Sequence, residues 1–309
     1  MKKILVTGGS GLIGSALKKI SSNYSYEFIF LNSKDADLTN QEATKILFDL
    51  HKPDYVIHLA ANVGGLFKNM NYKVDMFEKN LMINYNVIKS CYENNVEKSI
   101  NCLSTCIFPN KTTYPINEEM LHNGPPHNSN DAYAYAKRML EVQTTIYNNE
   151  KDTNYICVIP TNIYGEHDNY SLEDGHVIPA LIHRCYLAKK NNEDFIVKGS
   201  GKPLRQFIYS QDLAKLFMWT LENFREKTPL ILSVKDEISI EKIAILISKE
   251  FNYEHRMKFD TSFSDGQFKK TADNTKLMDL IGDFKFTPIE EGVKNSVKWF
   301  IENYDTTRK

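Results

Sequence analysis

Tyr133 and Lys137 stand four residues apart, a spacing that can support proton transfer. On a helix, residues four positions apart share a face, so the Lys137 ammonium can lie beside the Tyr133 phenol. An ordinary tyrosine titrates at about 10, and a neighbouring positive charge lowers that pKa, which makes the phenol a usable acid or base near neutral pH. Tyrosine–lysine pairs also occur as simple packing on helices, so the pair alone leaves both interpretations open.

Ser104 supplies a second part of this pattern. It follows Ser99–Leu103, which we expect to be a strand, so it should lie at the carboxyl edge of a parallel sheet, where ligands bind in open α/β folds. Its hydroxyl can hydrogen-bond the carbonyl oxygen that Tyr133 protonates. With a glycine-rich turn earlier in the chain, Ser104, Tyr133 and Lys137 predict an enzyme that transfers a hydride.

The glycine-rich turn is formed by Gly8, Gly11 and Gly14, directly after an apolar run and directly before a helical pattern. Glycine lets the strand turn sharply and lets a pyrophosphate approach backbone N–H groups at a helix N-terminus. A plain strand–helix turn is the alternative, but the position of the motif at the start of the chain favours a dinucleotide site.

The end of the expected second strand bears on the choice between NAD and NADP. Enzymes that use NAD usually carry an acid there, which would repel a 2′-phosphate. Here the residues are Asn32, Ser33 and Lys34, which suit a phosphate, although Asp35 and Asp37 follow shortly after. We therefore predict NADP(H).

These residues must be positioned by an α/β fold. Short β-branched runs alternate with helical segments, which predicts a Rossmann-type doubly wound parallel sheet with a smaller C-terminal substrate-binding region. We place the NADP-binding domain at 1–164 and the mainly substrate-binding region at 165–309, with returns to the main sheet near Gln206–Tyr209 and Ile231–Val234. The expected strands and helices of the first domain are 3–7, 27–31, 54–58, 99–103 and 155–160, and from about 12, 77–94 and 132–147.

Composition excludes several classes of protein. The 309 residues carry a formal net charge of -1, so no nucleic-acid or anionic-membrane surface is expected. The five cysteines form no pair with metal-ligand or redox spacing, and no apolar run reaches the length of a membrane helix. We expect no metal, a reducing compartment and a cytoplasmic location.

Several longer stretches resemble the GDP-L-fucose synthase family of extended short-chain dehydrogenase/reductases, over essentially the whole chain. They include LSTCIFPNKTTYPINE (103–118), PTNIYGEHDN (160–169), EDGHVIPALIHR (173–184), RQFIYSQDLA (205–214) and SDGQFKKTAD (264–273), of which the first three are the most specific. The resemblance implies epimerisation at carbons 3 and 5 of GDP-4-keto-6-deoxy-D-mannose and NADPH-dependent reduction at carbon 4 to GDP-L-fucose. It also implies a homodimer through a four-helix interface that includes the helices at 77–94 and 132–147.

The resemblance also assigns roles by position. Ser104, Tyr133 and Lys137 match the reductase triad, and Cys106 and His176 match an epimerase acid/base pair, which is chemically apt because inversion beside a ketone needs a base on one face and an acid on the other. Which of the two is the base stays open. The implied substrate contacts are Asn162, Arg184, Lys198, Arg205 and Lys270. The implied cofactor contacts are Gly8, Gly11, Leu12, Ile13, Gly14, Ser33, Lys34, Asp37, Leu38, Ala60, Ala61, Tyr133, Lys137, Pro160, Asn162, Ile163 and His176.

Alternatives follow from single positions. Lys198 stands where the family usually has a tryptophan beside the nucleobase, so the base, and with it the sugar nucleotide, is less firmly implied. The chain could instead be a 4-reductase, or an epimerase/reductase of another nucleotide-linked keto-deoxy sugar. A non-catalytic NADP-binding subunit is a third interpretation, disfavoured because every member of the triad is present. Cysteine is also commonly a core residue, which is the structural alternative for Cys106.

Overall fold

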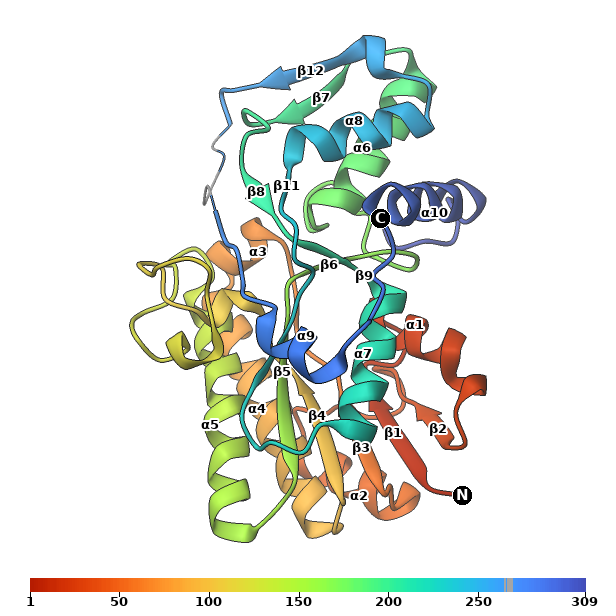
Figure 1. The fold of residues 1–309 in the computed structure, drawn as a ribbon. Coiled ribbons are helices and arrows are strands. Elements are labelled where there is room, and N and C mark those ends of the chain that lie inside the picture. The colour runs from red at the N-terminus through yellow and green to blue at the C-terminus, as the bar shows by residue number, and fades with distance from the viewer. Residues whose placement is uncertain (264, 266–268) are drawn as a thin grey trace.

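The computed structural model describes residues 1–263, 265 and 269–309, and its centre is a six-stranded parallel sheet (Figure 1). Part of the 264–273 motif therefore lies outside the described residues. Across the sheet the strands are β10 (Leu230–Leu232), β5 (Tyr155–Pro160), β4 (Lys98–Cys102), β3 (Tyr55–His58), β1 (Lys3–Thr7) and β2 (Glu27–Phe30). This order reverses at β1 and β3, as in a doubly wound fold, so the predicted fold class is confirmed.

Alternating side chains along each strand supply two cores, one on each face of the sheet. In β1, Leu5 belongs to one buried cluster, whereas Ile4 and Val6 belong to the other. Side chains of a strand point to opposite faces in turn, so a sheet covered on both sides needs apolar residues at every position. The first core is closed by α2 (Gln41–His51), α4 (Lys73–Glu93) and α5 (Asp131–Lys151), and the second by α1 (Leu12–Ile20) and α7 (Ser210–Asn223).

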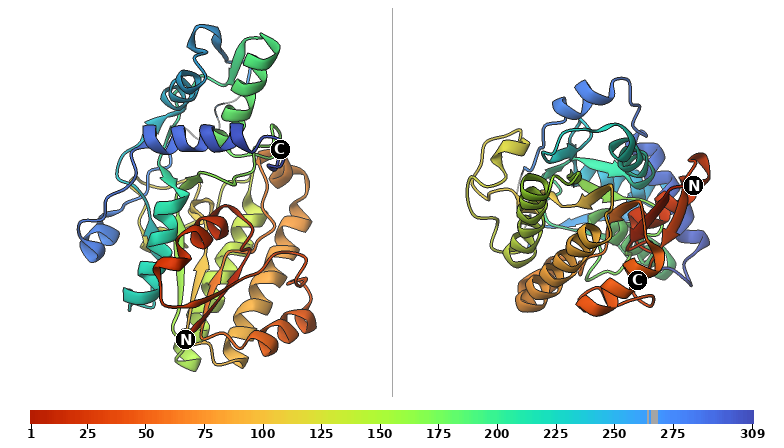
Figure 2. Two further views of the ribbon diagram at one scale, coloured as in Figure 1. Left: turned by 90° about the vertical axis from the view of Figure 1, so that its right-hand side faces the viewer. Right: turned by 90° about the horizontal axis from the view of Figure 1, so that it is seen from below.

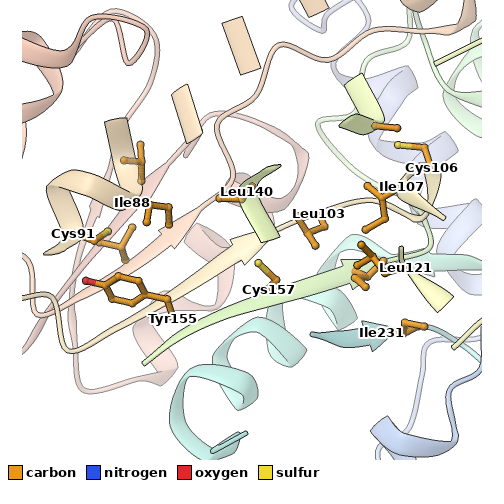
Figure 3. Close-up of a cluster of buried hydrophobic side chains, with 14 of the residues drawn as sticks. Ile88, Cys91, Leu103, Cys106, Ile107, Leu121, Leu140, Tyr155, Cys157 and Ile231 are labelled. Atoms are coloured by element: carbon orange, nitrogen blue, oxygen red, sulfur yellow. The ribbon is translucent and has the colours of Figure 1, made fainter. Parts of the chain in front are cut away.

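The first core reaches the cleft described below. Its buried residues run from Cys91 and Tyr155 at one end to Cys106 and Leu121 at the other (Figure 3). Cys106 therefore lies at the end of this core that is next to Ser104, the predicted catalytic serine. The intervening short helical turns are η2 (Thr105–Ile107) and η3 (Glu118–Met120).

A second region lies beyond the carboxyl edge of the sheet and has its own apolar core (Figures 1 and 2). The helices of this region are α6 (Val177–Asn191), α8 (Ile240–Glu250) and α10 (Ile289–Glu302). Its strands are β6 (Asn162–Tyr164), β7 (Phe195–Lys198), β8 (Leu204–Arg205), β9 (Phe207–Tyr209), β11 (Ile238–Ser239) and β12 (Met257–Asp260), which pair as β6–β9, β7–β12 and β8–β11. The remaining elements are α3 (Leu66–Asn71), α9 (Thr275–Ile281), η1 (Ser21–Asn23) and η4 (Glu254–Arg256).

One of the two expected returns to the main sheet is wrong. β10 pairs with β5 in the central sheet, but β9 pairs in parallel with β6 in a separate two-stranded sheet. The physical reason is that the edge of β5 is already occupied by β10, so the apolar β9 pairs instead with β6, the strand that follows β5. The division at residue 164 itself stays a prediction.

Most other predicted elements are confirmed to within a few residues. The helix expected at 77–94 begins four residues earlier, at Lys73, and α5 extends to Lys151. The sequence interpretation did not include α2, whose start is fixed by the Asn40 side chain accepting a hydrogen bond from the Ala43 amide. Within the described residues, no helix is long and apolar enough to cross a membrane.

Candidate active site

A cleft of about 1060 Å³ lies where the carboxyl ends of the central strands meet the second region. Residues that directly follow β1, β3 and β4 form one wall, among them Gly8, Ala60 and Ser104. Lys198 and Arg205 of the second region line the same cleft. Its size and its position at the carboxyl edge of the sheet match a site for a dinucleotide together with a second ligand.

The glycine turn at this wall fits a pyrophosphate. Gly8 has φ +68°, and a Cβ there would lie 2.8 Å from the Ala60 amide nitrogen. A Cβ on Gly14 would lie 2.5 Å from the Gly9 Cα, so glycine lets α1 approach the turn. Gly11 is the N-cap of α1 and offers no side-chain cap, which leaves first-turn N–H groups available to a phosphate.

The two acids after β2 are both engaged by local turns. Asp35 accepts a hydrogen bond of 2.7 Å from the Asn32 amide, and it is not part of the cleft wall. Asp37 lines the cleft, but its Oδ1 accepts hydrogen bonds from the Thr39 amide and hydroxyl, which lower its pKa. Ser33 lines the cleft, and Lys34 lies outside the lining set.

Ser104 lies at the start of η2 with its hydroxyl directed by the backbone. Its Oγ accepts a hydrogen bond of 3.4 Å from the Cys106 amide. The hydroxyl hydrogen is therefore free to be donated to a ligand oxygen. The η2 turn is held in place by α5, because the Arg138 Nε donates to the Ile107 carbonyl at 2.6 Å.

Tyr133 and Lys137 share one face of α5, as their spacing predicts. Lys137 is buried, with 2% of its surface exposed, and its Nζ donates to the Cys102 carbonyl at 2.8 Å. The same Nζ lies 5.9 Å from the centre of the Tyr133 ring. Both side chains line the cleft with Ser104, so the structure brings the three predicted residues together.

The pKa of Tyr133 departs from the sequence expectation. Burial raises it well above the ordinary value, and the nearby Cys106 and Cys102 thiols act in the same direction. Burial also lowers the pKa of Lys137. The expected downward shift is therefore wrong for the protein without its ligands, and Tyr133 is held as a neutral phenol.

His176 and Asn162 line the cleft from the second region. His176 is the N-cap residue of α6 and lines the cleft. The surrounding protein partly desolvates its imidazole, which lowers its pKa. Asn162 begins β6, and both its backbone N–H and its Nδ2 donate to the Gln206 carbonyl, at 3.2 and 2.9 Å. The other predicted cofactor contacts that line the cleft are Gly11, Leu12, Ile13, Gly14, Leu38, Ala61, Pro160 and Ile163.

Three further predicted residues are not among those that line the cleft. Cys106 is buried at 8% exposure in the first core, Lys270 is electrostatically coupled to Cys106 and Arg205, and Arg184 projects from α6. Arg184 and Lys270 have no hydrogen-bond or ion-pair partner in the part of the chain that the structure describes, and burial lowers the pKa of each. Partly buried cations without partners favour an anionic ligand.

Arg205 and Lys198 differ in their surroundings. The Arg205 Nη1 donates to the Leu204 carbonyl at 2.7 Å, and Glu237 and Tyr114 act electrostatically on its guanidinium. Lys198 is exposed at the end of β7, with its Nζ 4.6 Å from the centre of the Phe263 ring. The lysine that replaces the expected tryptophan thus contacts an aromatic side chain.

Sequence reasoning missed several charged residues of the cleft, among them Asp168 and Arg308. Asp168 is buried, its Oδ2 has no hydrogen-bond partner, and burial raises its pKa to about 7. Arg308 donates to the His167 carbonyl at 2.8 Å and acts electrostatically on Asp168. Asp168 falls in the quoted PTNIYGEHDN stretch, so an acid inside a family-like segment was the available signal. Among the described residues no group of acids, histidines and cysteines could hold a metal ion.

Comparison with known proteins gives one consistent result. The model of the NAD dependent epimerase/dehydratase family matches residues 4–234. The chain is 56% identical to GDP-L-fucose synthase of Dictyostelium discoideum, covering 100% of this chain and 98% of that protein. It is 50% identical to a probable GDP-L-fucose synthase of Drosophila melanogaster, covering 100% of both. A crystal structure of a GDP-L-fucose synthetase from Naegleria fowleri bound to NADP superimposes with a TM-score of 0.96, at 50% identity, covering 100% of this chain and 95% of that one.

Proposed function

The chain belongs to the GDP-L-fucose synthase branch of the NAD dependent epimerase/dehydratase family, and we propose that it converts GDP-4-keto-6-deoxy-D-mannose to GDP-L-fucose by epimerisation and reduction. The cofactor is NADPH, which supplies the hydride for carbon 4. Gly11 and the first turn of α1 would hold its pyrophosphate, and Ser33 would contact its 2′-phosphate.

The observation that carries this proposal is the pairing of two kinds of group along one cleft. Ser104, Tyr133 and Lys137 form a carbonyl-reducing set at the sheet edge, and Lys198 and Arg205 are cations that line the cleft from the second region. Lys270 does not line the cleft but interacts electrostatically with Arg205. A reducible ketone carried on a nucleoside diphosphate satisfies both sets at once.

Three residues carry the reduction. The neutral Tyr133 phenol donates its proton to the oxygen at carbon 4, and burial favours that protonated state before the reaction. Ser104 donates its free hydroxyl hydrogen to the same oxygen. Lys137, fixed by the Cys102 carbonyl, places its charge beside the tyrosine and so stabilises the phenolate that the proton transfer leaves.

Cys106 and His176 carry the epimerisation. The ketone at carbon 4 acidifies the hydrogens at carbons 3 and 5, so one residue removes a proton and the other returns one on the opposite face. Reduction then removes the ketone and fixes the new configuration. Cys106 lies in η2, directly after the wall residues Ser104 and Thr105, and His176 is the N-cap of α6, so the pair comes from two different elements of the fold.

The proposal is tested by turnover in D₂O. We expect purified protein with GDP-4-keto-6-deoxy-D-mannose and NADPH to give GDP-L-fucose with deuterium at carbons 3 and 5, read by NMR and mass spectrometry. Reduction without deuterium incorporation would indicate a simple 4-reductase. If this substrate is not turned over but another nucleotide keto-sugar supports NADPH oxidation, the substrate is that other sugar. Absence of NADPH binding would indicate the regulatory-subunit alternative.

Variants assign the two proton carriers. Cys106→Ser and His176→Asn should each lower deuterium incorporation, because each removes one partner of the pair. Cys185→Ser is the matched control, because Cys185 is also buried but lies in the separate core of the second region. Equal loss of incorporation in Cys106→Ser and Cys185→Ser would show that the Cys106 effect is structural.

Location and assembly extend the proposal. All five cysteines are free thiols, which suits the reducing cytoplasm. The outer faces of α4 and α5 expose an apolar stripe, defined here as Met82, Tyr85, Tyr92, Tyr135, Met139 and Ile146. Two copies of this helix pair would bury the stripe in a four-helix interface, which supports a homodimer.

A further inference from the structure

Gln206 lies at the centre of a hydrogen-bond network that joins three separate segments. Its side chain is almost fully buried, with 1% of its surface exposed. The Nε2 donates to the carbonyls of Val234, Lys235 and Ala272, at 2.8, 3.3 and 3.0 Å. The Oε1 accepts from the Ala272 amide at 2.8 Å. No role has been given to this residue so far.

The contact with Ala272 has the form of a backbone pair. The Gln206 amide offers one donor and one acceptor to the carbonyl and amide of the same residue, as a neighbouring strand would. This arrangement also fixes the amide orientation, because the reverse placement would put Oε1 against three carbonyl oxygens. Gln206 therefore holds one face of the segment 269–273, which we call the strap.

The other face of the strap is held by the segment that carries Cys106. Ile116 donates to the Thr271 carbonyl at 2.8 Å and accepts from the Asp273 amide at 2.7 Å. The Thr271 hydroxyl and the Lys269 ammonium both bind Glu237. The strap thus crosses between the substrate-side region and the catalytic segment, and its Lys270 is electrostatically coupled to both Cys106 and Arg205.

Arg205 and Lys270, two cations of the proposed substrate site, are both connected to Gln206 through the backbone. Arg205 is its immediate neighbour, and Lys270 lies two residues before the Ala272 that it holds. Arg205 and Lys270 repel each other, so a mobile strap would let Lys270 move away from Arg205 when no anion lies between them. Fixing Ala272 to Gln206 keeps the two charges at a set separation.

We propose that Gln206 is a positioning residue that holds Arg205 and Lys270 as a two-cation clamp for the diphosphate of the nucleotide-sugar substrate. The proposal rests on the function proposed above, since it names the residue that sets the geometry of that anion site. Gln206 acts through Lys270 and touches no ligand itself. The preassembled clamp spares the ligand the cost of ordering the strap on binding.

A double-mutant cycle on GDP binding tests whether Gln206 acts through Lys270. We expect Gln206→Met, which keeps the side-chain length without hydrogen bonds, to raise the GDP dissociation constant about tenfold in the wild-type background. In a Lys270→Met background the same change should raise it less than about twofold, because the clamp is already lost. Calorimetric titration with GDP gives all four constants, and the constant for NADP⁺ should change less than about twofold throughout.

Asn148→Leu is the matched control. Asn148 is also a buried amide, which accepts from the Tyr155 amide and the Thr153 hydroxyl and donates to the Tyr155 carbonyl, but it lies near the amino-terminal end of β5. This variant should lower stability and leave GDP binding unchanged. An equal loss of GDP binding in the wild-type and Lys270→Met backgrounds, or an unchanged constant in Gln206→Met, would overturn the proposal.

Hydrogen exchange gives a readout that needs no ligand. The Ala272 amide has Gln206 as its acceptor, so Gln206→Met should speed exchange in a peptide covering the strap and leave Asn148→Leu unchanged there. Failure of the wild type to bind GDP would overturn the nucleotide assignment of the proposed function, whereas unchanged strap exchange in Gln206→Met would overturn the role of Gln206.

Discussion

The Tyr133 phenol lies inside the cleft wall beside the Cys102 and Cys106 thiols, and burial raises its pKa. A phenol that keeps its proton is a donor from the outset, so Tyr133 suits the reduction step and not the removal of a carbon-bound proton. The two half-reactions therefore use different side chains, although their residues lie close together.

We expect Tyr133→Phe to separate these two half-reactions. Without the hydroxyl, reduction loses its proton donor and should slow by about 100-fold or more, measured as NADPH oxidation at 340 nm. Exchange of deuterium into the substrate should persist, because Cys106 and His176 are intact. Loss of exchange in parallel with reduction would place Tyr133 in the epimerisation and contradict this separation.

Asp168 gives a prediction about stability and pH. Burial raises its pKa to about 7, from an ordinary value near 3.8, and the charge of Arg308 only partly opposes the shift. Between about pH 4 and pH 7 the unfolded chain releases a proton that the folded protein keeps, so this group lowers stability as pH rises through that window. Above pH 7 the loss is complete.

The Asp168→Asn variant should remove this loss, because asparagine resembles the protonated acid. Relative to wild type, its free energy of unfolding should be higher by about 1–4 kcal/mol at pH 8 and nearly equal at pH 4. Urea unfolding at pH 4, 6 and 8 measures the difference. A gain that is the same at all three values would show that Asp168 does not titrate in this range.

At the scale of elements, α1 is placed by one close contact. Gly14 faces the glycine turn, and a Cβ there would meet the backbone of Gly9 at 2.5 Å. Neither partner can yield easily, because both belong to the backbone that would hold the cofactor pyrophosphate. The position of the helix N-terminus relative to β1 therefore depends on this residue.

We expect Gly14→Ala to displace α1 and weaken NADPH binding about tenfold or more, with a loss of stability of about 1–3 kcal/mol. Gly124→Ala is the control, because the nearest atom to its added Cβ is a Pro109 side-chain carbon at 3.4 Å, an ordinary contact. Fluorescence titration with NADPH and thermal unfolding of both variants provide the comparison. Unchanged NADPH affinity in Gly14→Ala would show that α1 adapts without loss.

Element prediction from sequence succeeded where the signal was local. The apolar runs of β1 and β5 and the glycine turn are visible in consecutive residues, so both strands were predicted with the bounds that the structure shows. The pairing of β9 with β6 was missed, because a three-residue strand does not say which edge is free. The raised pKa of Tyr133 and the hydrogen bonds of Gln206 depend on residues more than 25 positions away, so spacing could not reveal them.

At the scale of the whole molecule, the apolar stripe on α4 and α5 is the surface feature with the clearest consequence. On α5, Tyr135, Met139 and Ile146 recur at helical spacing and are each 40% exposed or more. Exposed apolar residues in a row favour association, whereas isolated ones are common on any protein. Ser104, Tyr133, Lys137 and His176 of a single chain line one cleft, so we expect turnover not to depend on assembly.

Light scattering after size exclusion should therefore give twice the mass of one chain for the wild type. A Met139→Lys, Ile146→Lys double variant should give the mass of one chain, because two lysines cannot be buried unpaired in an apolar interface. The matched control is Ile46→Lys, Leu50→Lys, which charges two still more exposed apolar residues on α2, outside the stripe, and should stay dimeric. We expect the monomeric variant to keep turnover, since its cleft is intact. A wild type that runs as a monomer would refute the homodimer. Loss of turnover in the monomeric variant would show that contact with the partner chain keeps Tyr133 and Lys137 of α5 in their active positions.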